Sequence, residues 1–247
     1  MRLLTWNLRN GAGRGIWQQL MEEVKADIVF LQELDVAPAG EGMAWETVPS
    51  ARWGSAVVTT LGSIRSIGVP GYEGWVAGGE IRSPCGPLFA FSVHVPSTTR
   101  QVVRRPYPQE AITIIDRIRS VVGADGGLVI GGDFNFTLGE RHPSEDRKTS
   151  PDERLALDAI SAAGLVSCWT AAHPTEPLGQ TLRWSGDRSP GKTTPYHCDG
   201  LLVSKAWASG ATCTIHLDER FTVSDHNPIS AVLPLLNSGG ATRYPCP

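Results

Sequence analysis

Leu128–Asn135, with the sequence LVIGGDFN, is an apolar run that passes through two glycines into polar residues. The apolar residues predict a buried β-strand, and the glycines allow the backbone to approach a ligand closely. The stretch therefore predicts a strand that ends at a site, to which it delivers Asp133 and Asn135. A glycine turn closed by an Asx hydrogen bond is the alternative interpretation.

The same arrangement occurs twice nearer the N-terminus. In Leu3–Asn7 and Ile28–Glu33, apolar residues precede a polar one. Because strand ends that converge on one edge of a sheet form the sites of α/β proteins, these polar residues are expected to meet. Six short motifs follow, lie in or precede such strands: Thr5-Trp6-Asn7, Gln32-Glu33, Ser92-Val93-His94, Gly132-Asp133-Phe134-Asn135, Cys198-Asp199-Gly200 and Ser224-Asp225-His226.

Composition fits one globular domain. The chain has 247 residues, 41% of them hydrophobic and 19% charged, which a single large core can accommodate. The net charge of −3 gives no overall attraction to nucleic acid or anionic membranes, so such binding needs a local patch. Five cysteines without a C-x-x-C pair argue against a zinc ribbon and a fully paired secreted framework. Without a long apolar run or an N-terminal h-region, we expect a cytoplasmic monomer with no membrane span.

Helices are predicted in three places. Helical spacing of apolar residues occurs at Ile16–Val24 and Tyr107–Val122. A capping box at Ser150–Glu153, with proline at the first helical position, begins a third helix that Gly164 is placed to end.

Strands account for most of the remaining chain. Short β-rich runs between Val36 and Pro87 predict an antiparallel meander. Two halves, each with strands and helices, predict two packed sheets flanked by helices, in one domain over 1–236 with a loose tail at 237–247. The expected strands are Arg2–Leu8, Asp27–Gln32, Ser55–Leu61, Gly74–Ile81, Leu88–Val95, Gly127–Gly131, Leu165–Thr170, Gln180–Trp184, Asp199–Ser204, Cys213–Leu217 and Pro228–Leu233.

The six motifs, in this order, resemble those of the endonuclease/exonuclease/phosphatase family. That family comprises metal-dependent phosphoesterases, among them deoxyribonucleases, abasic-site endonucleases, inositol-polyphosphate phosphatases and sphingomyelinases. The resemblance extends from about Leu3 to Leu233 and is sharpest at Gly132–Asn135 and Ser224–His226. It implies an α/β fold, a four-layer α/β sandwich in which two packed mixed β-sheets are flanked by helices.

Oxygen-bearing side chains together with histidines suit a hard divalent cation, a water molecule and an acid–base imidazole. The resemblance implies Mg²⁺ or Mn²⁺, with Glu33 as first ligand and Asn7 beside it. Asp225 is the candidate for a second metal position. A solvated acid at a strand end is the alternative for Glu33.

The resemblance also implies catalytic roles. Asp133 would orient or deprotonate the attacking water, and Asn135 would hydrogen-bond the phosphate or fix the histidine. His226 would contact the scissile phosphate or the water, with Asp199 holding its other ring nitrogen. His94 would stabilise the phosphate. Ordinary explanations are an interior histidine for His94 and a cap ahead of a proline for the Ser224–His226 motif.

Substrate contacts are expected from Arg100, Arg104 and Arg105, which follow His94 in a stretch without acids. A solvated loop is the alternative, and Trp184 is assigned equally to packing or to the site. Abasic-site enzymes of the family carry Tyr-x-Pro-Asn at the third motif and Arg-Ile-Asp-Tyr at the fifth. His94–Ser97 and His197–Gly200 depart from both patterns, so the third motif looks more like the deoxyribonuclease and phosphatase branches.

The leading hypothesis is a Mg²⁺-dependent phosphodiester hydrolase, a nuclease that acts on DNA or RNA by metal-assisted attack of water on phosphorus. The alternative is a phosphatase or phosphodiesterase for a small-molecule or lipid phosphate, which suits the modest negative charge. A non-catalytic binding module with the same fold is the third hypothesis. Its weakness is that every polar position expected from the family is filled.

Overall fold

The computed structural model describes residues 1–11, 15–40, 42–83, 86–96, 106–123, 127–145, 147–183 and 196–234. Three predictions fall outside this part of the chain: the arginines Arg100, Arg104 and Arg105, the aromatic Trp184, and the tail at 237–247.

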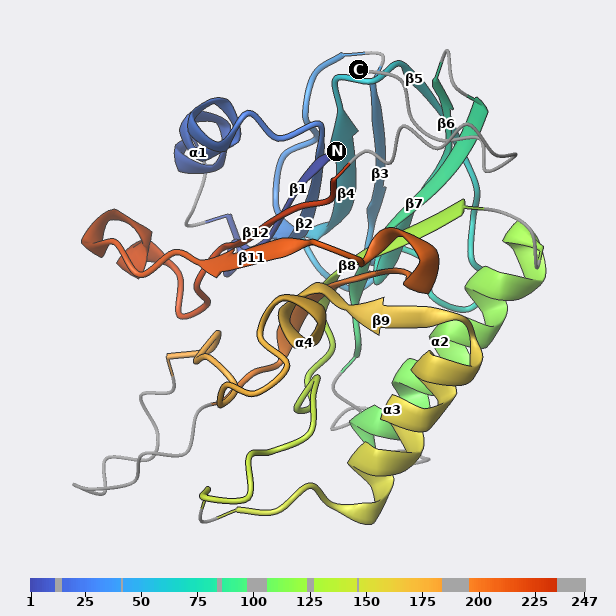
Figure 1. Cartoon of the computed structure of the whole chain (residues 1–247). Coiled ribbons are helices and arrows are strands. Elements are labelled where there is room, and N and C mark those ends of the chain that lie inside the picture. Colours follow the sequence, from blue (N-terminus) through green and yellow to red (C-terminus); the bar gives the residue numbers. More distant parts are fainter. Residues whose placement is uncertain are drawn as a thin grey trace.

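Two six-stranded sheets form the centre of the molecule (Figure 1). The first has the order β11-β12-β1-β2-β4-β3 and the second the order β5-β6-β7-β8-β10-β9. The first comprises β1 (Arg2–Asn7), β2 (Ile28–Leu34), β3 (Met43–Thr47), β4 (Gly54–Thr59), β11 (Thr212–Ile215) and β12 (Ile229–Val232). The second comprises β5 (Ser63–Ser66), β6 (Val76–Ser83), β7 (Gly86–His94), β8 (Gly127–Asp133), β9 (Leu165–Ser167) and β10 (Asp199–Ser204).

Helices cover the outer faces of both sheets, which confirms the predicted α/β sandwich. Figure 1 shows α1 on one side of the molecule and α2 and α3 together on another. The α-helices are α1 (Ile16–Val24), α2 (Tyr107–Val122), α3 (Pro151–Ala162) and α4 (Cys168–Ala172), and the short 3-10 helices are η2 (Lys205–Trp207) and η3 (Glu219–Val223). The capping box of α3 is present, because the Glu153 amide donates to Ser150 Oγ at 3.2 Å and the Ser150 amide donates to Glu153 Oε2 at 2.8 Å.

Three hydrophobic clusters hold these layers together. The cluster between the two sheets includes Phe30 and Val129, both fully buried. A second cluster joins α1 to the first sheet through Leu20, and a third joins α2 and α3 to the second sheet through Ile114 and Ile160. Burial of apolar surface on both faces of each sheet explains why the strands read as apolar runs.

The strand directions bring the polar motifs to one place. β1 and β2 are parallel neighbours connected through α1, and β7 and β8 are parallel neighbours connected through α2. In register, Asn7 lies opposite Gln32, and His94 lies opposite Asp133. Parallel neighbours end at the same edge of a sheet. Asp199 begins the antiparallel strand β10 opposite Asp133, so it lies at that edge as well.

The structure corrects several expectations. The strand predicted at Leu165–Thr170 stops at Ser167, and α4 begins at Cys168. Trp169 stacks on His173 four residues later, with ring centroids 4.1 Å apart, so packing on one helix face overrides the strand propensity of the segment. The strand predicted at Gln180–Trp184 is also wrong within the described residues, where Leu182 forms only an isolated bridge.

The region between Val36 and Pro87 is antiparallel, as predicted, but it is not one meander. It divides between the sheets, with β3 and β4 in the first and β5, β6 and β7 in the second. The chain therefore passes from one sheet to the other after β4. Local sequence does not encode that choice, which depends on which face of each strand meets the common core.

Close packing of the two sheets gives a test of the fold. A Cβ atom at Gly131 would lie 2.5 Å from the Phe30 ring, so Gly131→Ala should lower the free energy of unfolding by about 1–3 kcal/mol. Gly68→Ala is the matched control, because its Cβ would meet nothing nearer than Glu46 Oε1 at 4.0 Å. Urea unfolding should place the control within about 0.5 kcal/mol of the parent. Equal stability of the two variants would contradict this packing.

Candidate active site

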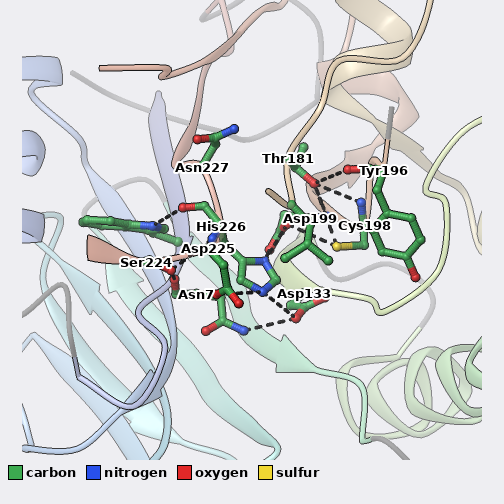
Figure 2. Close-up of polar contacts among 12 residues, drawn as sticks. Asn7, Asp133, Thr181, Tyr196, Cys198, Asp199, Ser224, Asp225, His226 and Asn227 are labelled. Atoms are coloured by element: carbon green, nitrogen blue, oxygen red, sulfur yellow. Dashed lines mark hydrogen bonds and ion pairs between the residues drawn. The ribbon is translucent and has the colours of Figure 1, made fainter. Parts of the chain in front are cut away.

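The polar residues at the edges of both sheets form one connected cluster, with links of 2.9–3.9 Å between neighbouring members. Figure 2 shows Asn7, Asp133, Asp199 and His226 pointing toward one another. Every metal-binding and catalytic candidate identified in the sequence belongs to this site cluster. Its members are Asn7, Glu33, His94, Asp133, Asn135, Asp199, Asp225 and His226.

Asn7, at the end of β1, connects the two sheets. Its Nδ2 donates to Glu33 Oε1 at 3.2 Å in the first sheet and to Asp133 Oδ2 at 3.1 Å in the second. Its Oδ1 accepts from the Arg9 amide at 3.0 Å. One amide group therefore spans two carboxylates, so those carboxylates lie close together across the junction of the sheets.

Glu33 lies at a β-bulge rather than at a simple strand end. The register between β2 and β4 shifts between Leu31 and Leu34, and Glu33 has a left-handed φ of 53°. A non-glycine residue in this region costs ~1–3 kcal/mol and persists only where neighbours hold it. Here the Asn10 amide donates to Glu33 Oε2 at 3.0 Å and the Gly11 amide donates to the Glu33 carbonyl at 2.9 Å. The bulge re-aims this side chain toward the cluster.

Asp133 occupies the centre of the cluster and is 2% exposed. Its Oδ2 lies 3.7 Å from Nε2 of His94 and 3.8 Å from Nε2 of His226. The Asn135 amide donates to Oδ1 at 2.9 Å, while the Asn135 side chain donates to the Val95 carbonyl at 2.8 Å. Burial, assisted by the nearby carboxylate of Asp199, raises the pKa of Asp133.

His226 is held by a carboxylate on the side away from Asp133. Its Nδ1 donates to both oxygens of Asp199 at 3.0 Å. Burial lowers the pKa of His226, but Asp199 and then Asp133 outweigh it and raise the pKa to about 10. The ring is therefore an imidazolium at neutral pH, with Nε2–H available toward the centre of the site. The Ser224 hydroxyl accepts from the His226 amide at 3.1 Å and fixes the backbone.

His94 faces the same carboxylate of Asp133, but its ring is neutral where that of His226 is charged. Burial lowers the pKa of His94, and the opposing effect of Asp133 does not reverse this shift. The two imidazoles differ because His226 has a dedicated carboxylate partner, whereas the buried Nδ1 of His94 has no hydrogen-bond partner among the residues that the structure describes. The site cluster therefore presents one neutral and one charged ring to Asp133.

Asp225 lies at the rim of the site cluster. Its side chain is 36% exposed and lies 3.7 Å from Arg9 Nε and 3.9 Å from His226 Nε2. The Arg183 amide donates to the Asp225 carbonyl at 2.6 Å. Arg183 Nε also donates to Asn227 Oδ1 at 2.6 Å, so Arg183 holds the loop on both sides of His226.

Sequence reasoning missed several supporting residues. The Thr181 hydroxyl accepts from the Cys198 amide at 2.9 Å and the Asp199 amide at 3.1 Å, which fixes the start of β10. Gln32 Nε2 donates to Ser92 Oγ at 2.8 Å across the two sheets. Gln32 and Ser92 stand inside the quoted motifs, so their position was a usable signal. Thr181 acts on residues 17 and 18 positions away and carries no comparable signal.

Two groups of side chains that share Asp133 could bind a metal ion. Ligand atoms of Asp133, Cys198, Asp199 and His226 all lie within 4.8 Å of one another. Burial raises the pKa of Cys198 well above 9, so its sulfur is a neutral thiol, and Nδ1 of His226 already bonds Asp199. The carboxylates of Glu33 and Asp133, with the amide oxygen of Asn7 that also accepts from the Arg9 amide, form the other group. An oxygen-only set fits a hard divalent cation better than one with a thiol does.

Fold and site together define a hydrolase built on a two-sheet α/β sandwich, with an acid–imidazole site at the edges of both sheets. The chain belongs to the Endonuclease/Exonuclease/phosphatase family, whose model matches residues 4–226. It is therefore an enzyme that acts on ester bonds. In the part of the chain that the structure describes, no helix has both the length and the apolar character to cross a membrane.

Other known proteins resemble this chain in sequence or in fold. The Transposon TX1 uncharacterized 149 kDa protein of Xenopus laevis is 28% identical over 124 residues, which is 50% of this chain and 9% of that protein. An AP endonuclease from Archaeoglobus fulgidus superimposes with a TM-score of 0.67 at 19% identity, covering 95% of this chain and 100% of that one. The 3′ phosphatase NExo from Neisseria, bound to product DNA hairpin, gives 0.71 at 20% identity with the same coverage. These two structures establish the shared fold.

The His226–Asp199 pair gives a titration test in metal-free protein. Asp199→Asn removes the nearer carboxylate, so the pKa of His226 should fall from about 10 by more than one unit. Because the folded-state pKa is raised, the pair stabilises the protein fully below about pH 6.5, and this stability is lost as the pH rises through about 10. The variant should lose that pH dependence. Imidazole NMR and urea unfolding at several pH values measure both effects.

Asp158→Asn, an exposed acid on α3, is the control for this titration. It should leave the His226 resonance and its titration unchanged. An unaltered His226 pKa in Asp199→Asn would show that the carboxylate is not its partner.

Proposed function

We propose that the chain is a divalent-metal-dependent phosphodiester hydrolase that acts on DNA or RNA. The observation that carries this proposal is the position of Asp133. It lies beside the Nε2 atoms of His94 and His226, with Asn7 and Glu33 on its other side. Such a site has a proton acceptor, a proton donor and cation-binding oxygens within one small volume.

Asn7 and Glu33 are the proposed metal ligands, with Asp225 at the rim as a further oxygen donor. A bound Mg²⁺ or Mn²⁺ would neutralise phosphate charge and stabilise the leaving oxygen. The site fits such an ion because two carboxylates, those of Glu33 and Asp133, both accept from the side-chain amide of Asn7. Two carboxylates that contact the same amide group favour a cation beside them.

Asp133 is the proposed base that orients the attacking water and accepts its proton. Burial raises its pKa, which makes the carboxylate a better proton acceptor than an exposed aspartate. The Asn135 backbone amide fixes one oxygen of this carboxylate and leaves the other facing the histidines. We assign Asn135 to holding Asp133, because the Asn135 side-chain amide is bonded to the Val95 carbonyl.

His226 is the proposed cationic donor. Asp199 holds Nδ1, so the proton on Nε2 can hydrogen-bond a phosphate oxygen or the departing oxygen. His94, whose lowered pKa keeps it neutral, would add a second hydrogen bond to the phosphate from Nε2. Two imidazole N–H donors placed in this way would stabilise the charge that develops on the phosphate in the transition state.

Nucleic acid is the proposed substrate class because two fold neighbours are described as an AP endonuclease and a phosphatase bound to a DNA hairpin. The role of Arg100, Arg104 and Arg105 as substrate contacts stays a prediction, as do the monomeric state and the cytoplasmic location. Abasic-site specificity is not proposed, because His94–Ser97 departs from the pattern of those enzymes.

Substrate class is tested by a metal-supplemented screen of plasmid, single-stranded DNA, RNA, an abasic oligonucleotide, inositol phosphates and a generic phosphodiester. Asp133→Asn is the inactive control. We expect cleavage of a nucleic acid. A plot of the logarithm of the enzyme's affinity for it against the logarithm of the salt concentration should have a slope of about −0.9 for each phosphate contact. Brisk turnover of a small phosphate, with salt-insensitive or absent nucleic-acid cleavage, would assign the site to the alternative substrate class.

Metal binding by Glu33 gives a separate prediction. Glu33→Gln keeps the shape of the side chain and removes its charge, so the Mg²⁺ concentration for half-maximal activity should rise at least tenfold. Activity is measured over a magnesium titration. Glu22→Gln, an exposed residue on α1, should follow the parent curve. An unchanged magnesium requirement in Glu33→Gln would remove Glu33 from the metal site.

A further inference from the structure

Two tryptophans lie against His94 at the edge of the site cluster. The ring centroids of Trp53 and His94 are 5.2 Å apart, and those of Trp75 and His94 are 5.3 Å apart. The two indoles meet edge to face at 5.1 Å. Both side chains are only partly buried. Because Nε2 of His94 faces Asp133, this aromatic pair adjoins the proposed position of the phosphate.

The hydrophobic core accounts for only part of this pair. Trp53 belongs to none of the three core clusters found among the described residues, and its recorded ring partners are Trp75 and His94. Trp75 packs against the cluster beneath α2 and α3 but stays partly exposed. Partly exposed tryptophans beside a polar site retain an aromatic surface that a ligand can cover.

Backbone contacts hold both tryptophans in place. The Trp53 carbonyl accepts from the Val48 amide at 3.0 Å, which closes a tight turn before β4. The Trp75 carbonyl accepts from the His94 amide at 2.8 Å and from Ser55 Oγ at 3.1 Å. Gly74 has φ of 76°, and a Cβ there would collide with the backbone of the 47–48 turn. The two turns are therefore packed against each other, so binding requires little ordering.

We propose that Trp53 and Trp75 form a stacking surface for an unpaired nucleobase next to the scissile phosphate. This inference rests on the proposed function and specifies its substrate. A base inside a duplex is already stacked on both faces, whereas an unpaired base can stack on an aromatic side chain. The enzyme should therefore favour single-stranded segments, frayed ends or extruded bases over intact duplex.

Stacking is tested by binding in the Asp133→Asn background, which separates affinity from turnover. Trp53→Leu and Trp75→Leu keep apolar bulk but remove the aromatic face. Each should weaken binding of oligo(dT) by about 5- to 100-fold, the equivalent of losing one stacked base. Trp53→Phe and Trp75→Phe should restore most of that affinity. Trp207→Leu, at the far end of β10 from Asp199, is the control and should bind as the parent does.

Two further ligands show whether weaker binding comes from lost stacking or from a displaced His94 ring. A base-less oligonucleotide with the same phosphates, and an intact duplex, should each bind the leucine variants within about twofold of the parent. Equal losses on all three ligands, no loss on oligo(dT), or no rescue by phenylalanine would each overturn the stacking surface. Absence of any phosphodiester cleavage by the parent enzyme would instead reject the proposed function, and the binding measurements would still decide on stacking.

Discussion

The structure depends on bringing three acidic groups together at the junction of two sheets, and two of them, Asp133 and Asp199, are buried. Asn7 donates to Glu33 in one sheet and to Asp133 in the other, so a single neutral amide stands between two carboxylates. Asp199 adds a third acid within reach of Asp133. Buried charges of one sign are costly unless cations compensate them. His226 supplies one positive charge, and the remaining acids provide the electrostatic reason to expect a divalent cation.

The directions of the strands bring these acidic groups and the histidines to one place. Two parallel pairs, β1–β2 and β7–β8, each end at the junction, and β10 begins there. The sheets need not be distorted to assemble the site, except at Glu33, where a bulge and a left-handed backbone turn the side chain inward. Asn135 in the same site also has a left-handed φ, of 54°. Local backbone strain that neighbouring groups hold in place is typical of a functional position.

Sequence reasoning succeeded where the signal was local. The helix at Tyr107–Val122, the capping box at Ser150 and the strand at Asp199–Ser204 all follow from periodicity or fixed spacing. It failed at Leu165–Thr170, where packing of Trp169 on a helix face outweighs strand propensity. The residues that complete the site, such as Thr181, act through contacts between distant segments that single-sequence patterns do not encode.

We propose that the oxygens of Asn7 and Glu33, rather than the thiol-containing group around Cys198, bind the metal ion. Anomalous diffraction from crystals soaked in Mn²⁺ locates the ion directly. Binding by Glu33 predicts a peak about 2.1 Å from one of its carboxylate oxygens, the bond length of a hard octahedral cation. A peak bonded to Cys198 and Asp199, with none beside Glu33, would contradict it.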